Sequence, residues 1–279
     1  MEIQLAPERL FLLEERLTVD EIQQRAMDKR TQAFAGGLGS LLQRPKTEEI
    51  FLVGKQRRLQ PFWHVAAAAK YVYERNREYT VPFSAPDVEA VTVDGIRHEA
   101  TAGAGPRGFR MTALEHCRDE FRTESFTDGL TGAPLTDAAA VMAGPRSEVS
   151  DPAVLSAENT IALPPEHRAS FVVRKTLQEV MKPVQADRVL EESITLENTD
   201  LYYRPIWAFE FAWQARGRQG VVEVDSVTGL TSQGRGMLSG VRGMLTRDLL
   251  FDVGADTVGL FVPGGSIAVK LAKAAIDNK

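Results

Sequence analysis

Cysteine and histidine are the residues of this chain whose types could support nucleophilic catalysis, and two of them are adjacent, as His116 and Cys117. A thiol nucleophile needs a base within hydrogen-bond reach. Neighbouring side chains on a helix point about 100° apart, so the base for Cys117 would have to be His64, His98 or His167. A structural cysteine beside a surface histidine is the simpler interpretation. A hydrolase that uses His98, His116 and Cys117 in a cleft is the alternative.

The spacing of the polar residues predicts neither a metal centre nor a nucleotide-binding loop. The sequence has no His-Glu-x-x-His motif, which would place two metal ligands on one helical face, and Gly234-Arg235-Gly236 lacks the full spacing of a phosphate-binding loop. Adjacent carboxylates such as Glu48-Glu49 are directed apart by strand or helix geometry. We therefore predict no catalytic residue, no metal and no cofactor.

Aromatic and basic side chains gather on segments that resemble strands and are the candidates for binding. Aromatic residues favour strands and bury large areas, so most of them are expected in the core. The alternative is an aromatic face with arginines beside it, which would suit an anionic polymer such as single-stranded nucleic acid. The candidate partner-binding residues on these segments are Arg57, Arg58, Trp63, Arg75, Arg77, Tyr202 and Trp207.

The C-terminal tail contributes a second candidate surface. Arg235-Gly236-Met237-Leu238 recurs seven residues later as Arg242-Gly243-Met244-Leu245. On a helix, Met237, Met244 and their leucine neighbours would share one face. That face would pack against the protein's own core, or alternatively bind a partner groove or an anionic membrane surface.

These residues must be positioned by elements that occur twice in the sequence. Pro61-Phe62-Trp63 reappears as Pro205-Ile206-Trp207, 144 residues later, and each copy follows a Glu-Glu pair and a short apolar run. After each Trp we expect a strand, a polar turn and a second strand, with the turns at residues 74–77 and 215–218. Such a pattern predicts two antiparallel hairpins.

A helical pattern precedes each predicted hairpin. Thr18 is followed three residues later by Glu21, as in a capping box, and Pro164-Pro165-Glu166 begins a second amphipathic pattern that stops at Pro183. Between the copies we expect Gly/Pro-rich loops around a helix near residues 111–121. The sequence therefore predicts an α+β fold of two related units, each a helix packed on an antiparallel sheet.

The second copy ends in Gly220-Val221-Val222-Glu223-Val224-Asp225-Ser226-Val227-Thr228-Gly229. Together with the preceding helix and hairpin, this segment resembles a PepSY-type or cystatin-like domain over about residues 164–230. Val91-Thr92-Val93-Asp94-Gly95 is a degenerate counterpart in the first half. The resemblance implies a non-catalytic module with a binding or regulatory role.

Four regions follow from these patterns: a first unit at residues 1–95, a loop-rich insertion at 96–163, a second, PepSY-like unit at 164–230 and a helical tail at 231–279. The formal net charge of −5 combines a basic region, 44–77, with an acidic one, 182–230. We predict a non-catalytic binding or scaffold protein that engages a macromolecular partner through its sheet faces and its Met-rich tail. Nucleic-acid binding by the basic first unit stays an alternative to this prediction.

The expected partner is another protein or a second copy of the chain. The single cysteine fits a reducing compartment, and residues 1–5 show no secretory signal. The apolar stretch at 257–269 is shorter than the roughly 20 residues of a spanning helix. We therefore expect a cytoplasmic protein without a transmembrane segment, whose tail could contact a membrane peripherally.

Overall fold

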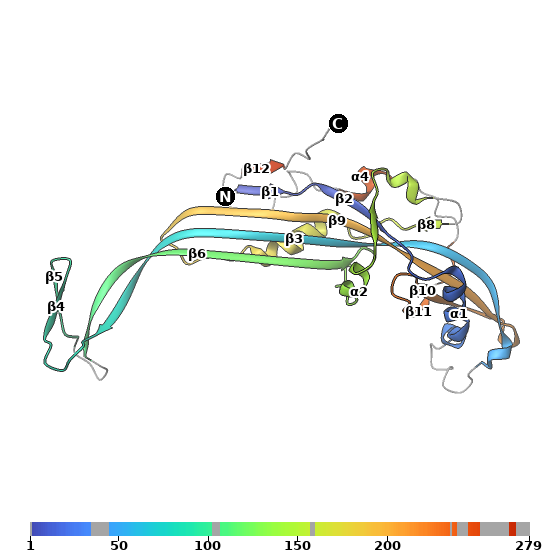
Figure 1. Cartoon of the computed structure of the whole chain (residues 1–279), viewed down its shortest axis with the longest axis horizontal. Helices are drawn as coiled ribbons and strands as arrows, with labels where there is room; N and C mark the ends of the chain where they lie inside the picture. Colours follow the sequence, from blue (N-terminus) through green and yellow to red (C-terminus); the bar gives the residue numbers. More distant parts are fainter. Residues whose placement is uncertain are drawn as a thin grey trace.

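Three long strands determine the shape of the molecule, which is a long arch (Figure 1). The computed structural model describes residues 2–34, 45–101, 107–156, 160–234, 236–238, 245–251 and 268–271. The long strands are β3 (Ile50–Pro82), β6 (Gly108–Asp128) and β9 (Arg188–Trp213). At roughly 3.3 Å per residue, the 33 residues of β3 alone extend over about 110 Å.

Strands β3 and β9 pair antiparallel along the middle of one mixed sheet, from Ile50 opposite Trp213 to Glu74 opposite Arg188. On the outer edge of β3 lie β6 and β8 (Thr160–Ala162). The outer edge of β9 carries three strands: β1 (Glu2–Leu5), β2 (Glu8–Leu13) and β10 (Arg218–Asp225).

Further out, the sheet ends in β7 (Arg146–Glu148), β11 (Thr231–Gly234) and β12 (Ala268–Leu271). Within the described ranges the sheet has ten strands. A separate hairpin is formed by β4 (Ala90–Val93) and β5 (Ile96–Glu99).

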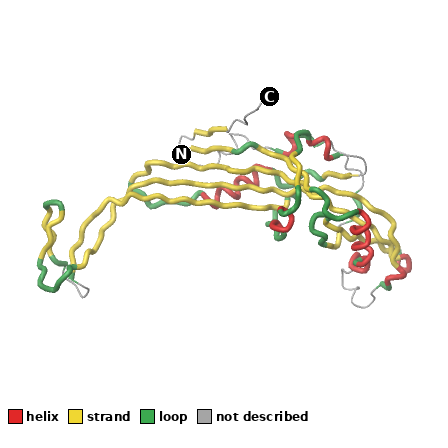
Figure 2. The backbone as a smooth tube through the Cα atoms, in the orientation of Figure 1, coloured by secondary structure: helices red, strands yellow, loops and turns green. Residues whose placement is uncertain are grey.

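Two longer helices, α1 (Val19–Asp28) and α3 (Ala169–Val180), cover one face of the sheet (Figure 2). Leu201 and Tyr203 of β9 belong to the core cluster under α3, whereas Phe209 and Phe211 belong to the cluster under α1. All four have odd numbers on a strand whose side chains alternate, so the two helices share a face. The short helices are α2 (Ala138–Met142) and α4 (Arg247–Leu250).

The alanine run 66–69 fits the middle strand of this sheet. Ala67 and Ala69 are buried in the cluster beneath α3, where small side chains let the helix approach the sheet. The intervening positions, Ala66 and Ala68, face the other side of β3 because side chains alternate along a strand. There, Arg122 of β6 reaches across β3 to Glu197 of β9, with 2.9 Å between Nε and the carboxylate.

The predicted α+β fold of two units, each with a helix on its own sheet, is wrong. Strands β3 and β9 come from the two predicted units but pair with each other, so the molecule is built around one large, strand-rich sheet. The turn expected at residues 74–77 lies inside β3, and the helix expected near 111–121 lies inside β6. Cross-strand pairing between β3 and β6 overrides the local signals at both places.

The register of the sheet nevertheless has an approximate two-fold symmetry, with its axis between Gln60 and Arg204. These two residues face each other and are 144 positions apart. Adding 144 to Leu59 and subtracting 144 from its partner Pro205 gives Tyr203 and Pro61, which are also paired. The same exchange relates β6 on β3 to β10 on β9, and β8 on β3 to β2 on β9.

Each helix lies on the strands of the other sequence copy. The backbone N–H groups of residues 16 and 17, just before α1, donate to the carbonyl of Ser226 in the turn after β10. Those of residues 166 and 167, just before α3, donate to the carbonyl of Gly129 in the turn after β6. The two copies are therefore interleaved, and each one needs the other to cover its sheet.

Candidate functional site

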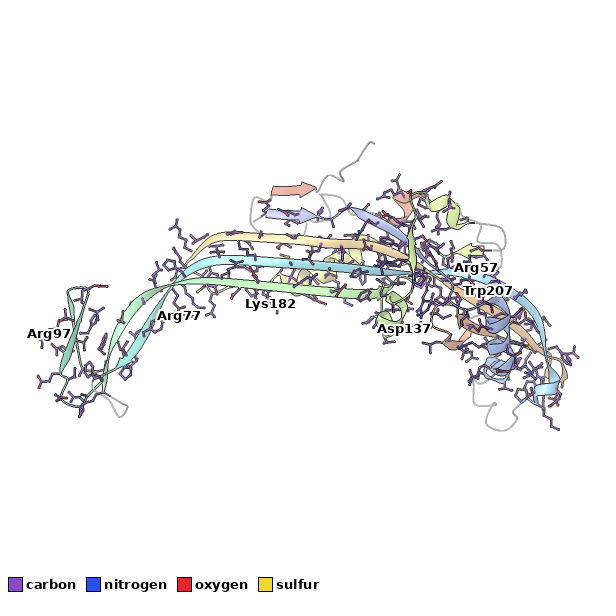
Figure 3. The ribbon with its side chains drawn as sticks, in the orientation of Figure 1. Arg57, Arg77, Arg97, Asp137, Lys182 and Trp207 are labelled. Atoms are coloured by element: carbon purple, nitrogen blue, oxygen red, sulfur yellow. The ribbon has the colours of Figure 1, made fainter. Side chains whose placement is uncertain are left out.

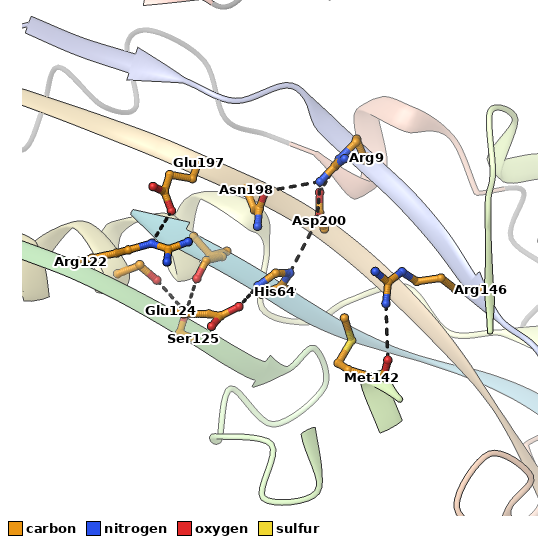
Figure 4. Close-up of polar contacts among 12 residues, drawn as sticks. Arg9, His64, Arg122, Glu124, Ser125, Met142, Arg146, Glu197, Asn198 and Asp200 are labelled. Carbon is orange, nitrogen blue, oxygen red and sulfur yellow. Dashed lines mark hydrogen bonds and ion pairs between the residues drawn. The ribbon is translucent and has the colours of Figure 1, made fainter. Parts of the chain in front are cut away.

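A polar cluster crosses four strands on the face of the sheet opposite α3 (Figure 4). Arg9 of β2 forms two hydrogen bonds of 2.9 Å with the carboxylate of Asp200 on β9. His64 of β3 lies next to it, with Nδ1 3.6 Å from Oδ2 of Asp200 and Nε2 2.7 Å from Oε1 of Glu124 on β6. The His64 ring stacks on Phe126, with the ring centroids 4.5 Å apart.

Two pKa shifts describe the electrostatics of this cluster. The hydrogen bond to Asp200 raises the pKa of Arg9, so Arg9 keeps its positive charge. Burial, followed by the nearby charge of Asp200, raises the pKa of Tyr202, whose ring lies beside His64. The charged members are thus held in place by opposite charges.

Among the described residues around the cluster, none is placed to act as a nucleophile. Ser125 is adjacent to Glu124, but its hydroxyl group is directed to the other face of β6, 2.9 Å from the hydroxyl of Thr176 on α3. No group of three or more His, Cys, Asp or Glu in the described ranges could hold a metal ion. What the geometry can do is link β6, β3 and β9 through Glu124, His64 and Asp200.

The residues of the hydrolase alternative do not converge. His116 and Cys117 are consecutive on β6, so their side chains lie on opposite faces of the sheet. His98 of β5 packs on Phe109, with ring centroids 5.0 Å apart. Phe109 is seven residues along β6 from His116, which corresponds to about 20 Å.

Both tryptophans of the Pro-x-Trp repeat hold the chain in front of a helix. Trp63 is fully buried and its indole N–H donates to the carbonyl of His167 at 2.7 Å. Trp207 is half-buried, and its indole N–H donates to Glu15 at 3.1 Å. Arg57 donates to the same carboxylate at 2.6 Å. The structure thus brings Arg57 and Trp207 together, but around an internal carboxylate.

Arg58 and Tyr202 are interior residues. Arg58 is 3% exposed; its guanidinium group lies 2.7 Å from Glu223 and also donates to the carbonyl of Gly236. Burial lowers the pKa of Arg58, and Glu223 partly offsets this effect. Tyr202 is stacked between Phe11 and Phe62.

The prediction of a helical tail at residues 231–279 is wrong: the described parts include the strands β11 and β12, and their helix is the four-residue α4. The two methionines of the predicted tail surface have different outcomes. Met237 lies with its sulfur 4.0 Å from a guanidinium nitrogen of Arg58. Met244 lies outside the described residues. The later segment 245–251 packs inward, since Leu245, Leu250 and Phe251 belong to the cluster under α3.

Arg75 and Arg77 stand apart from the other candidates, about 60 and 65 Å along β3 from Arg57. Arg75 pairs with Glu115 at 2.5 Å, and Arg77 donates to Gln185 at 2.9 Å. They belong to a projection that we call the arm, defined as residues 75–115.

The arm is a two-stranded ribbon that ends in the β4–β5 hairpin (Figure 3, near Arg77 and Arg97). It begins where the pairing of β9 with β3 stops, at Arg188 opposite Glu74. No described residue from 74 to 101 is buried. Three large side chains stay open to solvent: Tyr79 is 43%, Leu114 49% and Ile96 64% exposed.

The end of the arm has a defined backbone conformation. Asp94 and Gly95 connect β4 to β5 with φ values of 49° and 80°, both in the left-handed region that a two-residue type I′ turn requires. Asp-Gly suits that turn, and Ile96 follows it directly at the tip. Neither this turn nor the arm that carries it was predicted from the sequence.

The arm is also the place where the two sequence copies differ most. Equivalent residues are 144 apart in β3 and β9 but 97 apart in β6 and β10, so the first hairpin is longer by the difference, 47 residues. In the second copy, residues 214–217 close the hairpin directly. The arm is therefore an addition to one copy that the sheet itself does not require.

Comparisons with protein-family models, curated proteins and solved structures found no match for this chain. The resemblance of residues 164–230 to a PepSY-type or cystatin-like domain therefore stays a prediction. None of the helices in the described ranges is long and apolar enough to cross a membrane.

Proposed function

We propose that this chain is a non-catalytic scaffold or binding protein that engages a macromolecular partner through its arm. One observation carries the proposal: the described residues of the arm form strands and turns in which Gly108 and Phe109 alone are buried. Binding would cover the exposed side chains of Tyr79, Ile96 and Leu114.

A two-stranded ribbon is at best marginally stable in water. In the arm, polar contacts supply part of the missing stabilisation: Glu115 pairs with Arg75 and also accepts a hydrogen bond from Tyr79. The hydrogen bond from Tyr79 lowers the pKa of Glu115 most, and the bond from Arg75 lowers it further. Glu115 therefore stays charged. Such side-chain contacts keep the ribbon extended while its apolar side chains remain available to a partner.

Site-specific photo-crosslinking in cells that express the full chain tests this proposal. A photoreactive amino acid at Ile96 should give a crosslinked adduct with a partner, because Ile96 lies at the tip of the arm. Val154 is the matched control, since it is an equally exposed apolar residue, 63% against 64%, in the body of the molecule. The proposal fails if position 96 gives no adduct, or only the same products as position 154.

The partner is proposed to be another protein or a second copy of this chain, and the mass of the adduct distinguishes the two. Nucleic acid would appear as a nuclease-sensitive adduct. The cytoplasmic location inferred from the single cysteine is part of the same proposal.

A further inference from the structure

His64 is a buried titratable residue in the middle strand of the sheet, outside the arm. It is 7% exposed, and its Nε2 atom lies 2.7 Å from Oε1 of Glu124. Its Nδ1 atom has no hydrogen-bond partner among the described residues. The nearest charged atom on that side is Oδ2 of Asp200, at 3.6 Å.

Neither neutral form of the His64 ring can donate a proton to both carboxylates. With the proton on Nε2, the ring donates to Glu124 but turns the lone pair of Nδ1 toward the Asp200 carboxylate. With the proton on Nδ1, two acceptors, Nε2 and the Glu124 oxygen, would face each other at 2.7 Å. Only the doubly protonated ring presents a donor to both carboxylates.

We propose that His64 is a proton-responsive clamp, which joins β6 to β9 through Glu124 and Asp200 when its ring carries two protons. Other charged or titratable groups surround it: Arg9 of β2 lies beyond Asp200, Tyr202 of β9 lies beside the ring, and Arg146 of β7 lies over Tyr202. Arg122 of β6 and Glu197 of β9 form an ion pair in the same cluster (Figure 4). Asp200 is held between Arg9 and His64.

The sign of the effect follows from these contacts. Glu124 and Asp200 face the ring from both sides only in the folded chain. The clamp therefore predicts that the folded chain is more stable at pH 6, where more of the rings carry two protons, than at pH 8. The end of β6 near Glu124 and Phe126 is where the loosening should occur.

Thermal unfolding of the full chain at pH 6 and pH 8 tests the clamp. We expect the midpoint of the wild type to be about 2–4 °C higher at pH 6 than at pH 8. His64→Gln keeps a donor for Glu124 but has no counterpart of Nδ1, so this difference should become smaller. His98→Gln is the control, because His98 lies in the arm, away from the clamp, and packs on Phe109, and it should keep the wild-type difference.

The clamp is overturned if His64→Gln retains the wild-type difference between pH 6 and pH 8. Should His64→Gln fail to fold, the imidazole nitrogen resonances of His64 in the wild-type chain decide the matter. Two protonated nitrogens at pH 6 that become one at pH 8 support the clamp, and a neutral ring at pH 6 excludes it.

Discussion

Two equivalent turns with different burial give the sharpest test of how the sheet is held together. Asp128 ends β6 and Asp225 ends β10, and each begins an Asp-x-x-Thr-Gly turn. Oδ1 of Asp128 accepts from the backbone N–H groups two and three residues later, at 2.9 and 2.8 Å. Oδ1 of Asp225 accepts from the corresponding groups, at 2.7 and 3.1 Å. The hydrogen bonds of the two turns are the same.

Their surroundings differ. Asp128 is half-buried, so water can reach the two N–H groups that Asp128→Ala would expose, and we expect a loss of about 1–2 kcal/mol in unfolding free energy. Asp225 is 6% exposed and its Oδ2 lies 3.3 Å from Arg204. Asp225→Ala would leave two N–H groups without an acceptor and weaken the pairing of a largely buried guanidinium, for about 3–5 kcal/mol.

Guanidinium unfolding of the full chain, followed by circular dichroism and tryptophan fluorescence, measures both variants. The free energy of unfolding should be highest for the wild type, lower for Asp128→Ala and lowest for Asp225→Ala. Its slope against denaturant concentration should be the same for all three. Asp225→Asn keeps an oxygen at Oδ1 but loses the charge, so it should lie between Asp225→Ala and the wild type. If Asp128→Ala is as destabilising as Asp225→Ala, burial does not control the turn and the reasoning is wrong.

Three further outcomes can be measured on the same chain. Replacing residues 76–114 by Asn-Gly should move the calorimetric unfolding midpoint by less than about 2 °C, because the described residues removed are almost all at least partly exposed; a lost transition would contradict this. Gly220→Ala should cost about 2–3 kcal/mol in denaturant unfolding, since a Cβ there would lie 2.3 Å from the carbonyl oxygen of Ala33; full stability would refute that contact. Burial raises the pKa of Tyr203, so stability should fall as the pH rises above about 10, where an unfolded tyrosine ionises, and Tyr203→Phe should reduce that fall; equal alkaline profiles would exclude it.

Local signals predicted those elements whose structure depends on neighbours in the sequence. Thr18 and Glu21 form both hydrogen bonds of the expected capping box at the start of α1. The second predicted helix is present as α3 and ends before Pro183. The turn expected at residues 215–218 closes the β9–β10 hairpin, with Gly217 in the left-handed conformation.

The same signals failed where a distant strand determines the structure. Residues 74–77 are polar because both faces of the ribbon begin to be solvated there, and not because the chain turns. In β6, exposed and half-exposed residues alternate from Arg110 to Glu124, and most of the half-exposed ones are small or polar. This strand therefore has no apolar stripe that would distinguish it from a surface helix.

The polar cluster could not be predicted from spacing. Its members, Arg9, His64, Glu124 and Asp200, come from four strands and are separated by 55 to 76 positions in the chain. Only the register of β3 against β6 and β9 brings them together. It places His64 opposite Asp200 and opposite Phe126, with Glu124 two residues before Phe126 in β6. No local motif contains this register.

The Pro-x-Trp repeat contains two of the candidate binding residues, Trp63 and Trp207, but the two-fold relation gives it another role. The carbonyls of Pro61 and Pro205 accept hydrogen bonds from the turns after β6 and β10, at 2.9 and 3.2 Å. The indoles of Trp63 and Trp207 bind the segments in front of α3 and α1. Each copy of the motif thus joins one hairpin to the helix of the other copy. Because the repeated residues are used in this way, binding to a partner is best sought in the arm, where the copies differ.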